Sequence, residues 1–153
     1  MTDWKRTTRE VPFEGLMPDV ASAINAHIEL YNLGSILSDS FMCIQTDAEK
    51  AKKGLFGKTE YTLQVAVVTS YLLIWAVLNA NTPAVLSAQL SNVTVQDYAQ
   101  TPFAKMVPDS GIQVNGLFTD ASESASAFIG LDDSAAARKF KEILIKAVQD
   151  AKR

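Results

Sequence analysis

Residues 61–78 read YTLQVAVVTSYLLIWAVL, and this stretch decides the fold class of the 153-residue chain. It lies within a longer region, residues 61–96, that contains no charged side chain. A membrane-spanning helix needs about 20 continuous apolar residues, whereas Gln64, Thr69 and Ser70 interrupt this run. Val, Ile, Thr, Tyr and Trp, which are abundant here, are enriched in strands. We therefore expect buried β-strands in this stretch rather than a membrane-spanning helix.

Further strands are predicted on both sides of this stretch, because runs rich in β-branched and aromatic residues alternate with turn residues. Several runs alternate apolar and polar side chains, as in Val93-Thr-Val-Gln and Ile112-Gln-Val-Asn, which is typical of half-buried antiparallel strands. The strands we expect are 41–48, 61–69, 71–80, 84–90, 93–98, 111–118 and 124–131. So many short strands in succession predict a curled antiparallel sheet or a small barrel.

The last strand is followed by a predicted amphipathic helix, residues 134–152. Asp132, Asp133 and Ser134 supply an N-cap and early negative charge. The helix has an apolar stripe made of Ala136, Phe140, Ile143, Leu144, Ala147 and Ala151. Its basic side chains are expected on the solvent face, because the stripe is needed to cover the sheet.

A second helix is predicted before the first strand, over residues 18–37. Pro18 and Asp19 are favourable first residues, and Val20, Ile24, Ile28 and Tyr31 follow the spacing of one apolar stripe. Residues 1–17 are predicted to be an irregular arm whose Phe13, Leu16 and Met17 contact the body of the protein. With residues 38–153 forming a barrel and its C-terminal helix, the chain is expected to be one domain.

Two strings carry a resemblance to a known superfamily. They are Val67-Val-Thr-Ser-Tyr-Leu-Leu-Ile-Trp75 and Leu90-Ser-Asn-Val-Thr-Val95. The strings, and the element order over residues 38–152, resemble the pleckstrin-homology-like (PH-like) superfamily, in particular its compact bacterial and GRAM-like members. The chain departs from the pattern at Ser70 and Tyr71, where the family often has Asn or Asp followed by Arg.

The resemblance implies an α+β fold, in which a bent antiparallel barrel of about seven strands is capped by the C-terminal helix, here with an extra N-terminal helix. It implies a non-enzymatic binding or scaffolding domain that contacts a protein partner or a second copy of itself. A START-like helix-grip protein, which carries an apolar small molecule under a long C-terminal helix, remains the alternative. A small enzyme is a third possibility, although no motif supports it.

Composition excludes several classes of function. The net charge of −3 and the pI near 5.1 argue against a nucleic-acid-binding protein, which needs clustered Lys and Arg. One histidine and one cysteine are too few for most metal sites and catalytic triads, so we expect neither a metal nor a cofactor. The N-terminal residues have no apolar signal-peptide core, and the single cysteine, Cys43, indicates no disulfide. The expected compartment is the cytoplasm.

Isolated reactive residues are best explained structurally. His27 lies on the predicted N-terminal helix and is expected to cover its apolar stripe. Cys43 lies within a predicted strand and is expected to be a small buried hydrophobe rather than a nucleophile. Asp132 and Asp133 are expected to cap the C-terminal helix. The two glycines Gly54 and Gly57 lack the spacing of a phosphate-binding loop.

The loop between the first two expected strands is the candidate ligand site. It contains Lys50, Lys52, Lys53, Leu55, Phe56 and Lys58. In lipid-binding PH domains the corresponding hairpin is a basic clamp for phosphorylated headgroups, so the resemblance implies contact with an anionic membrane surface. Four lysines contribute about 4 kcal/mol near such a surface, which is an affinity of about 1 mM. Glu60 stands where the family continues with a basic residue, so a solvated hairpin is the alternative.

Overall fold

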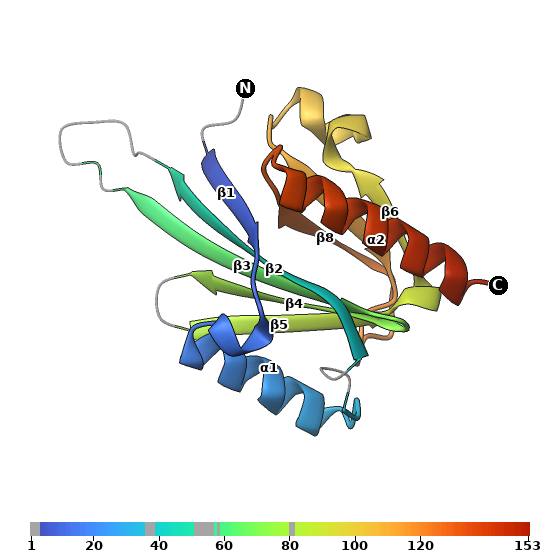
Figure 1. The fold of residues 1–153 in the computed structure, drawn as a ribbon. Coiled ribbons are helices and arrows are strands. Elements are labelled where there is room, and N and C mark those ends of the chain that lie inside the picture. The colour runs from blue at the N-terminus through green and yellow to red at the C-terminus, as the bar shows by residue number, and fades with distance from the viewer. Residues whose placement is uncertain (1–3, 36–38, 51–56, 58, 80–81) are drawn as a thin grey trace.

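A computed structural model describes residues 4–35, 39–50, 57, 59–79 and 82–153. Within these ranges the chain forms eight strands and two α-helices (Figure 1). In chain order they are β1 (Trp4–Glu10), α1 (Pro18–Leu30), β2 (Ser40–Lys50), β3 (Glu60–Thr69), β4 (Leu72–Asn79), β5 (Thr82–Gln89), β6 (Val93–Asp97), β7 (Gly111–Gly116), β8 (Ala125–Gly130) and α2 (Ala135–Ala151). The predicted α+β class is confirmed, and β2 to β8 correspond one by one to the seven predicted strands.

The strands form two antiparallel sheets. One has the order β1-β2-β3-β4-β5 and the other the order β6-β7-β8, so each sheet is a meander of consecutive strands. The described strands of the two sheets share no backbone ladder, and the sheets do not close into a barrel by strand pairing. Side chains connect them instead. The Gln64 side-chain amide donates to the Phe128 carbonyl at 3.4 Å and accepts from the Gly130 amide at 2.7 Å.

The first strand corrects the prediction of an irregular arm. Trp4–Glu10 pairs antiparallel with β2, from Trp4 opposite Lys50 to Glu10 opposite Ile44. Residues 4–10 show no apolar alternation, because β1 is an edge strand whose buried side chains, Thr8 and Arg6, are polar or charged. Thr8 is held by the segment before α2. Its amide donates to the Asp132 carboxylate at 2.8 Å, and its carbonyl accepts from the Ser134 hydroxyl at 3.3 Å.

The N-terminal helix is shorter than predicted. It ends at Leu30 rather than at residue 37, because Asn32 and Gly34 adopt left-handed conformations, with φ of 52° and 75°. The Leu33 amide donates to the Ile28 carbonyl and closes the end of the helix. In the preceding segment Leu16 is buried and Phe13 packs partly buried against the same core, as predicted, while Met17 is 44% exposed.

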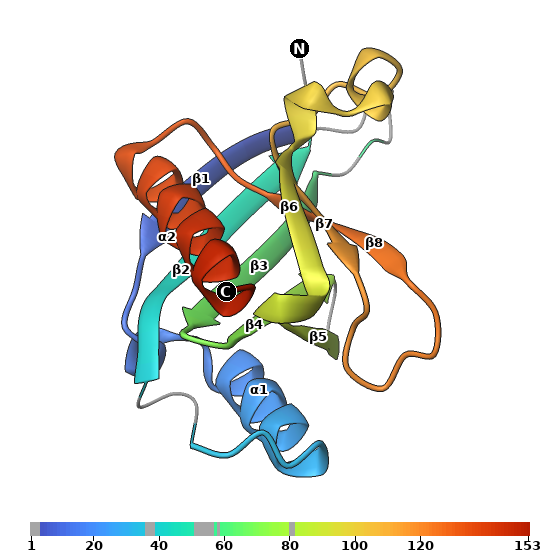
Figure 2. The same ribbon diagram turned by 90° about the vertical axis from the view of Figure 1, so that its right-hand side faces the viewer.

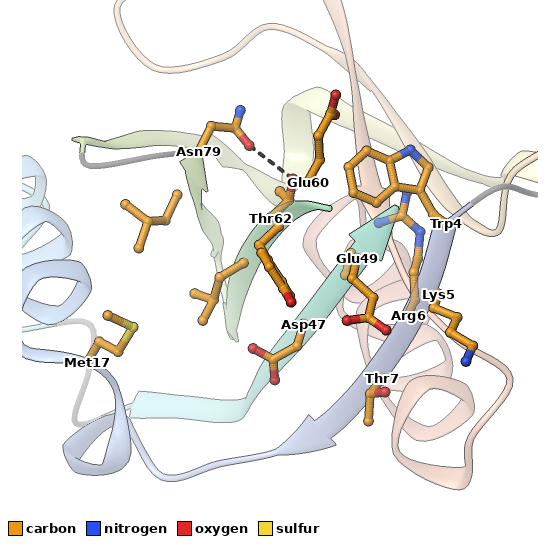
Figure 3. Close-up of a pocket in the computed structure, with 14 residues that line it drawn as sticks. Trp4, Lys5, Arg6, Thr7, Met17, Asp47, Glu49, Glu60, Thr62 and Asn79 are labelled. Carbon is orange, nitrogen blue, oxygen red and sulfur yellow. Dashed lines mark hydrogen bonds between the residues drawn. The ribbon is translucent and has the colours of Figure 1, made fainter. Parts of the chain in front are cut away.

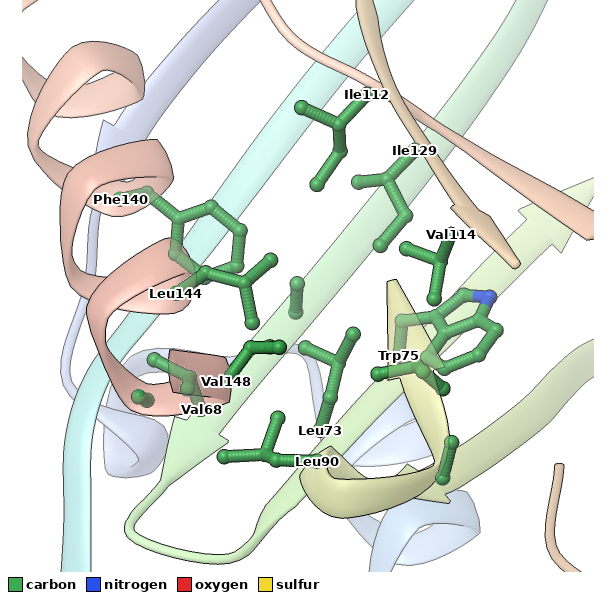
Figure 4. Close-up of a cluster of buried hydrophobic side chains, with 14 of the residues drawn as sticks. Val68, Leu73, Trp75, Leu90, Ile112, Val114, Ile129, Phe140, Leu144 and Val148 are labelled. Carbon is green, nitrogen blue, oxygen red and sulfur yellow. The ribbon is translucent and has the colours of Figure 1, made fainter. Parts of the chain in front are cut away.

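The main core lies between the two sheets and α2 (Figure 4). Val68, Leu73 and Trp75 extend from the five-stranded sheet toward the other two layers. They meet side chains from the three-stranded sheet and from α2, namely Ile112, Val114, Ile129, Phe140, Leu144 and Val148. The Trp75 and Phe118 rings contact edge to face, with their centroids 5.3 Å apart. Ile143, predicted on the same stripe as Phe140 and Leu144, packs against this core and is partly buried.

The opposite face of the five-stranded sheet packs against α1, and Figure 2 shows α1 and α2 on opposite sides of this sheet. Val20 and Ile24 are buried there, in one cluster with side chains of β2, β3 and β4. Because α1 packs mainly on β4 and β5, it covers only part of this face. Neither α-helix of the described chain is long and apolar enough to cross a membrane.

Candidate binding site

An open hollow of about 1400 Å³ lies where the ends of β1, β2, β3 and β4 extend beyond α1 (Figure 3). Its apolar floor is made of Met17, Leu63 and Leu78, with Tyr61 at the edge. The other described lining residues are Trp4, Lys5, Arg6, Thr7, Asp47, Ala48, Glu49, Glu60, Thr62 and Asn79. We call this concave surface the hollow.

Strand register brings the lining residues together. Thr7 lies opposite Asp47, Asp47 opposite Leu63, and Leu63 opposite Leu78, so one row crosses four strands. A second row runs through Lys5, Glu49 and Tyr61. Side chains two positions apart in a strand share one face of a sheet, so both rows face the α1 side. The apolar ends of these rows continue the core under α1, and their charged ends lie on β1 and β2.

The described lining carries one more acidic than basic side chain, and one of its carboxylates, that of Asp47, lies 4.0 Å from the exposed Arg9. Asp47, Glu49 and Glu60 supply three carboxylates, against the cations of Lys5 and Arg6. The Arg6 guanidinium is already paired, because it donates twice to the Asp109 carboxylate, at 2.8 and 3.1 Å. An apolar floor beside an acidic rim is suited to a ligand that carries both apolar side chains and a positive charge.

The described lining of the hollow contains neither histidine nor cysteine, and no group of described residues is arranged to hold a metal ion. No family model, curated protein or solved structure matches this chain. Its function is therefore inferred from the hollow itself.

The predicted lysine loop is placed only in part. Lys50 ends β2, and its ammonium lies 5.8 Å from the centroid of the Trp4 ring, close to the hollow. The remaining predicted site residues are Lys52, Lys53, Leu55, Phe56 and Lys58, which lie outside the described residues. The basic clamp therefore stays a prediction.

His27 has polar partners that its sequence neighbourhood does not reveal. Its Nε2 lies 2.8 Å from the Ser87 hydroxyl on β5, which lies 2.6 Å from the Thr119 hydroxyl after β7. The Thr119 amide also donates to the Ser87 carbonyl. Ser87 is only 1% exposed, so this pair has no open face for a substrate. The contact connects α1 to both sheets, and the predicted structural role of His27 agrees with this placement.

The contact predicts a pH dependence of stability. Burial lowers the pKa of His27 from its ordinary value of 6.5, so the unfolded chain binds the proton more readily than the folded protein. The free energy of unfolding is expected to fall as the pH drops from about 6.5 toward the lower pKa of the folded state. In thermal unfolding at about pH 7.5 and pH 5.5, His27→Gln should lose less stability than the wild type. An equal loss in both proteins would contradict the prediction.

The remaining single residues have structural roles. Burial, with a smaller contribution from the charge of Glu14, raises the pKa of Cys43 to about 12, so its thiol is protonated at neutral pH. Ser134 caps α2, since its hydroxyl accepts from the Ala137 amide at 3.2 Å. Burial alone would raise the pKa of Asp132, but hydrogen bonds from Ser134 and Thr8 hold it below its ordinary value. Asp132 thus connects the start of α2 to β1.

Proposed function

We propose that the chain is a non-enzymatic PH-like binding domain whose hollow takes a segment of a protein partner. The order of elements supports the PH-like part of this proposal. Four strands, β2 to β5, are followed by three, β6 to β8, and then by a helix that packs between the sheets. In this interpretation β1 and α1 are additions before the common fold, and the proposed compartment is the cytoplasm.

The shape and chemistry of the hollow carry the binding proposal. At about 1400 Å³ it exceeds the roughly 300–1000 Å³ of typical small-molecule sites, which favours a chain segment over a small ligand. Tyr61 lies at the edge of the hollow and is 68% exposed. It stands in one row with the charged residues Lys5 and Glu49. An exposed aromatic side chain beside an apolar floor is typical of the energetic centre of a protein interface.

The packed interior weighs against the alternative of a helix-grip carrier. A carrier needs an internal cavity beneath its C-terminal helix, but that space is filled by Trp75, Phe140 and Leu144 with their neighbours. The hollow lies instead at the ends of β1 to β4, away from the core under α2, and is open to solvent. Contact of the lysine loop with anionic lipid remains a separate proposal that concerns residues outside the described ranges.

Peptide selection tests the proposed function. A displayed library of random peptides is selected on the wild type, and binding of the enriched peptides is followed by Trp4 fluorescence. Trp4 lines the hollow, whereas Trp75, the other tryptophan, is buried in the core. We expect the enriched peptides to combine apolar residues with Lys or Arg and to change the Trp4 emission.

The decisive comparison uses a hollow variant, Glu49→Lys with Tyr61→Ser. Removing one apolar contact and reversing one charge should weaken binding by about tenfold or more. The matched control, Phe41→Ser with Glu142→Lys, changes an exposed aromatic residue and an exposed carboxylate away from the hollow and should bind normally. Equal binding by the hollow variant, with an unchanged Trp4 signal, would refute the proposed function.

A further inference from the structure

A short turn between β6 and β7 exposes large apolar side chains. We call residues 102–107 the apolar turn. Phe103, Met106 and Val107 are 59%, 82% and 63% exposed, the densest run of exposed large hydrophobic residues in the described chain. The turn lies at the same end of the molecule as the start of β1 (Figures 1 and 2). Clustered exposed apolar residues mark interaction sites in soluble proteins.

The apolar turn is held in place by the body of the protein. The Tyr98 hydroxyl donates to the Val107 carbonyl at 2.6 Å, and the Tyr98 ring packs against Phe128, with centroids 5.0 Å apart. The Val107 amide donates to the Phe103 carbonyl at 2.8 Å and closes the turn. Its apolar side chains are therefore presented in a fixed arrangement, which lowers the entropic cost of binding.

The turn and the hollow are chemically complementary. The turn carries one charge, the exposed Lys105, between Phe103 and Met106. The hollow offers an apolar floor, with the carboxylates of Asp47 and Glu49 on the same face of the sheet. We propose that the hollow of one molecule binds the apolar turn of a second copy of this chain. This inference rests on the proposed function, since it names the occupant of the same site.

The contact joins two different surfaces, so it is heterologous. Each molecule offers one turn and one hollow, and a heterologous contact that does not close into a ring continues by adding molecules. The six-residue turn makes a small interface, which is typical of weak association. Self-association is therefore expected to rise with protein concentration and to continue beyond dimers.

Sedimentation velocity over a range of protein concentrations tests the inference. The wild type should show a weight-average sedimentation coefficient that increases with concentration. A turn variant, Phe103→Gln with Met106→Gln, should need about tenfold or more higher concentration for the same increase. The matched control replaces two exposed apolar residues on the helices, Leu30→Gln with Ile145→Gln, and should behave as the wild type.

Mixing two defective proteins tests the head-to-tail geometry. The turn variant keeps its hollow, and the hollow variant, Glu49→Lys with Tyr61→Ser, keeps its turn. Each should remain monomeric alone, while the mixture should form a one-to-one complex and nothing larger. In a single chain, Lys105→Glu combined with Glu49→Lys should associate more than either single variant, because the charge pair is restored with reversed signs.

Two results would overturn the inference. One is a wild type that stays monomeric at protein concentrations up to about 1 mM, where even a weak specific association is populated. The other is a turn variant that associates as the wild type does. If selected peptides still bind the hollow in either case, only the identity of the occupant is wrong and the proposed function stands. If peptides also fail, both proposals fall.

Discussion

A chain that ends at Asp133 is expected to lose the cooperative unfolding transition of the intact protein. Phe140 and Leu144 of α2 are fully buried between the two sheets, with Ala137, Ala147 and Val148 beside them. Each large side chain contributes about 1.5–3 kcal/mol when buried. Because the total stability of a domain is about 5–15 kcal/mol, losing the helix removes a large part of it and exposes the core.

Thermal unfolding followed by near-ultraviolet circular dichroism measures this effect. A chain that ends at Ala151 is the matched control, because it loses only the exposed Lys152 and Arg153 and should melt as the intact protein does. Within the intact chain, Phe140→Ala should cost about 3–5 kcal/mol. A sharp transition of the shorter chain near the intact melting temperature would mean that α2 is not part of the cooperative core.

Replacing Arg6 by Gln is expected to lower the free energy of unfolding by about 3–5 kcal/mol. Its side chain is 8% exposed and makes a two-pronged ion pair with Asp109, just before β7. Its guanidinium also lies 5.4 Å from the centroid of the Phe128 ring. Loss of the cation removes both charge-assisted hydrogen bonds from Arg6 to the largely buried Asp109 carboxylate.

Chemical denaturation of matched variants checks this prediction. Arg9→Gln makes the same change on the same strand, but Arg9 lies 4.0 Å from Asp47 in an exposed pair, so the cost should be about 0–1 kcal/mol. Arg6→Gln combined with Asp109→Asn removes both charges and should be less destabilised than Arg6→Gln alone. If Arg6→Gln and Arg9→Gln lowered the free energy of unfolding equally, the buried pair would contribute no more to stability than the exposed one.

The sequence predicted those parts of the fold in which burial follows a periodic apolar pattern. Both α-helices and several strands have such a pattern, while β3 and β4 form one long apolar run of strand-favouring residues. The order and approximate bounds of α1, α2 and β2 to β8 were therefore predicted correctly, apart from the early end of α1. The strand β1 has no such pattern, since its stability comes from pairing with β2 and from contacts with Asp109 and Asp132. Asp109 and Asp132 lie more than 100 residues further along the chain, so the sequence of residues 4–10 alone does not predict these contacts.

The hollow was not predicted, for a related reason. Its lining comes from four strands and the segment before α1, and strand register alone brings Asp47, Leu63 and Leu78 into one row. In the sequence, Asp47, Glu49 and Glu60 stand out only as acidic charges that flank and weaken the lysine loop. With the strands assigned, the alternation of positions 47 and 49 and of positions 61 and 63 would have placed them on one face.

The position of β1 has a consequence for the order in which the protein matures on the ribosome. Thr8 leaves the exit tunnel before the Asp132 and Ser134 groups that bind it, because these lie 124 and 126 residues further along the chain. Arg6 likewise pairs with Asp109, which is synthesised 103 residues later. Native contacts between such distant residues close large loops and slow folding. The strand β1 is thus synthesised well before the groups that bind it, and this domain remains incomplete until α2 emerges.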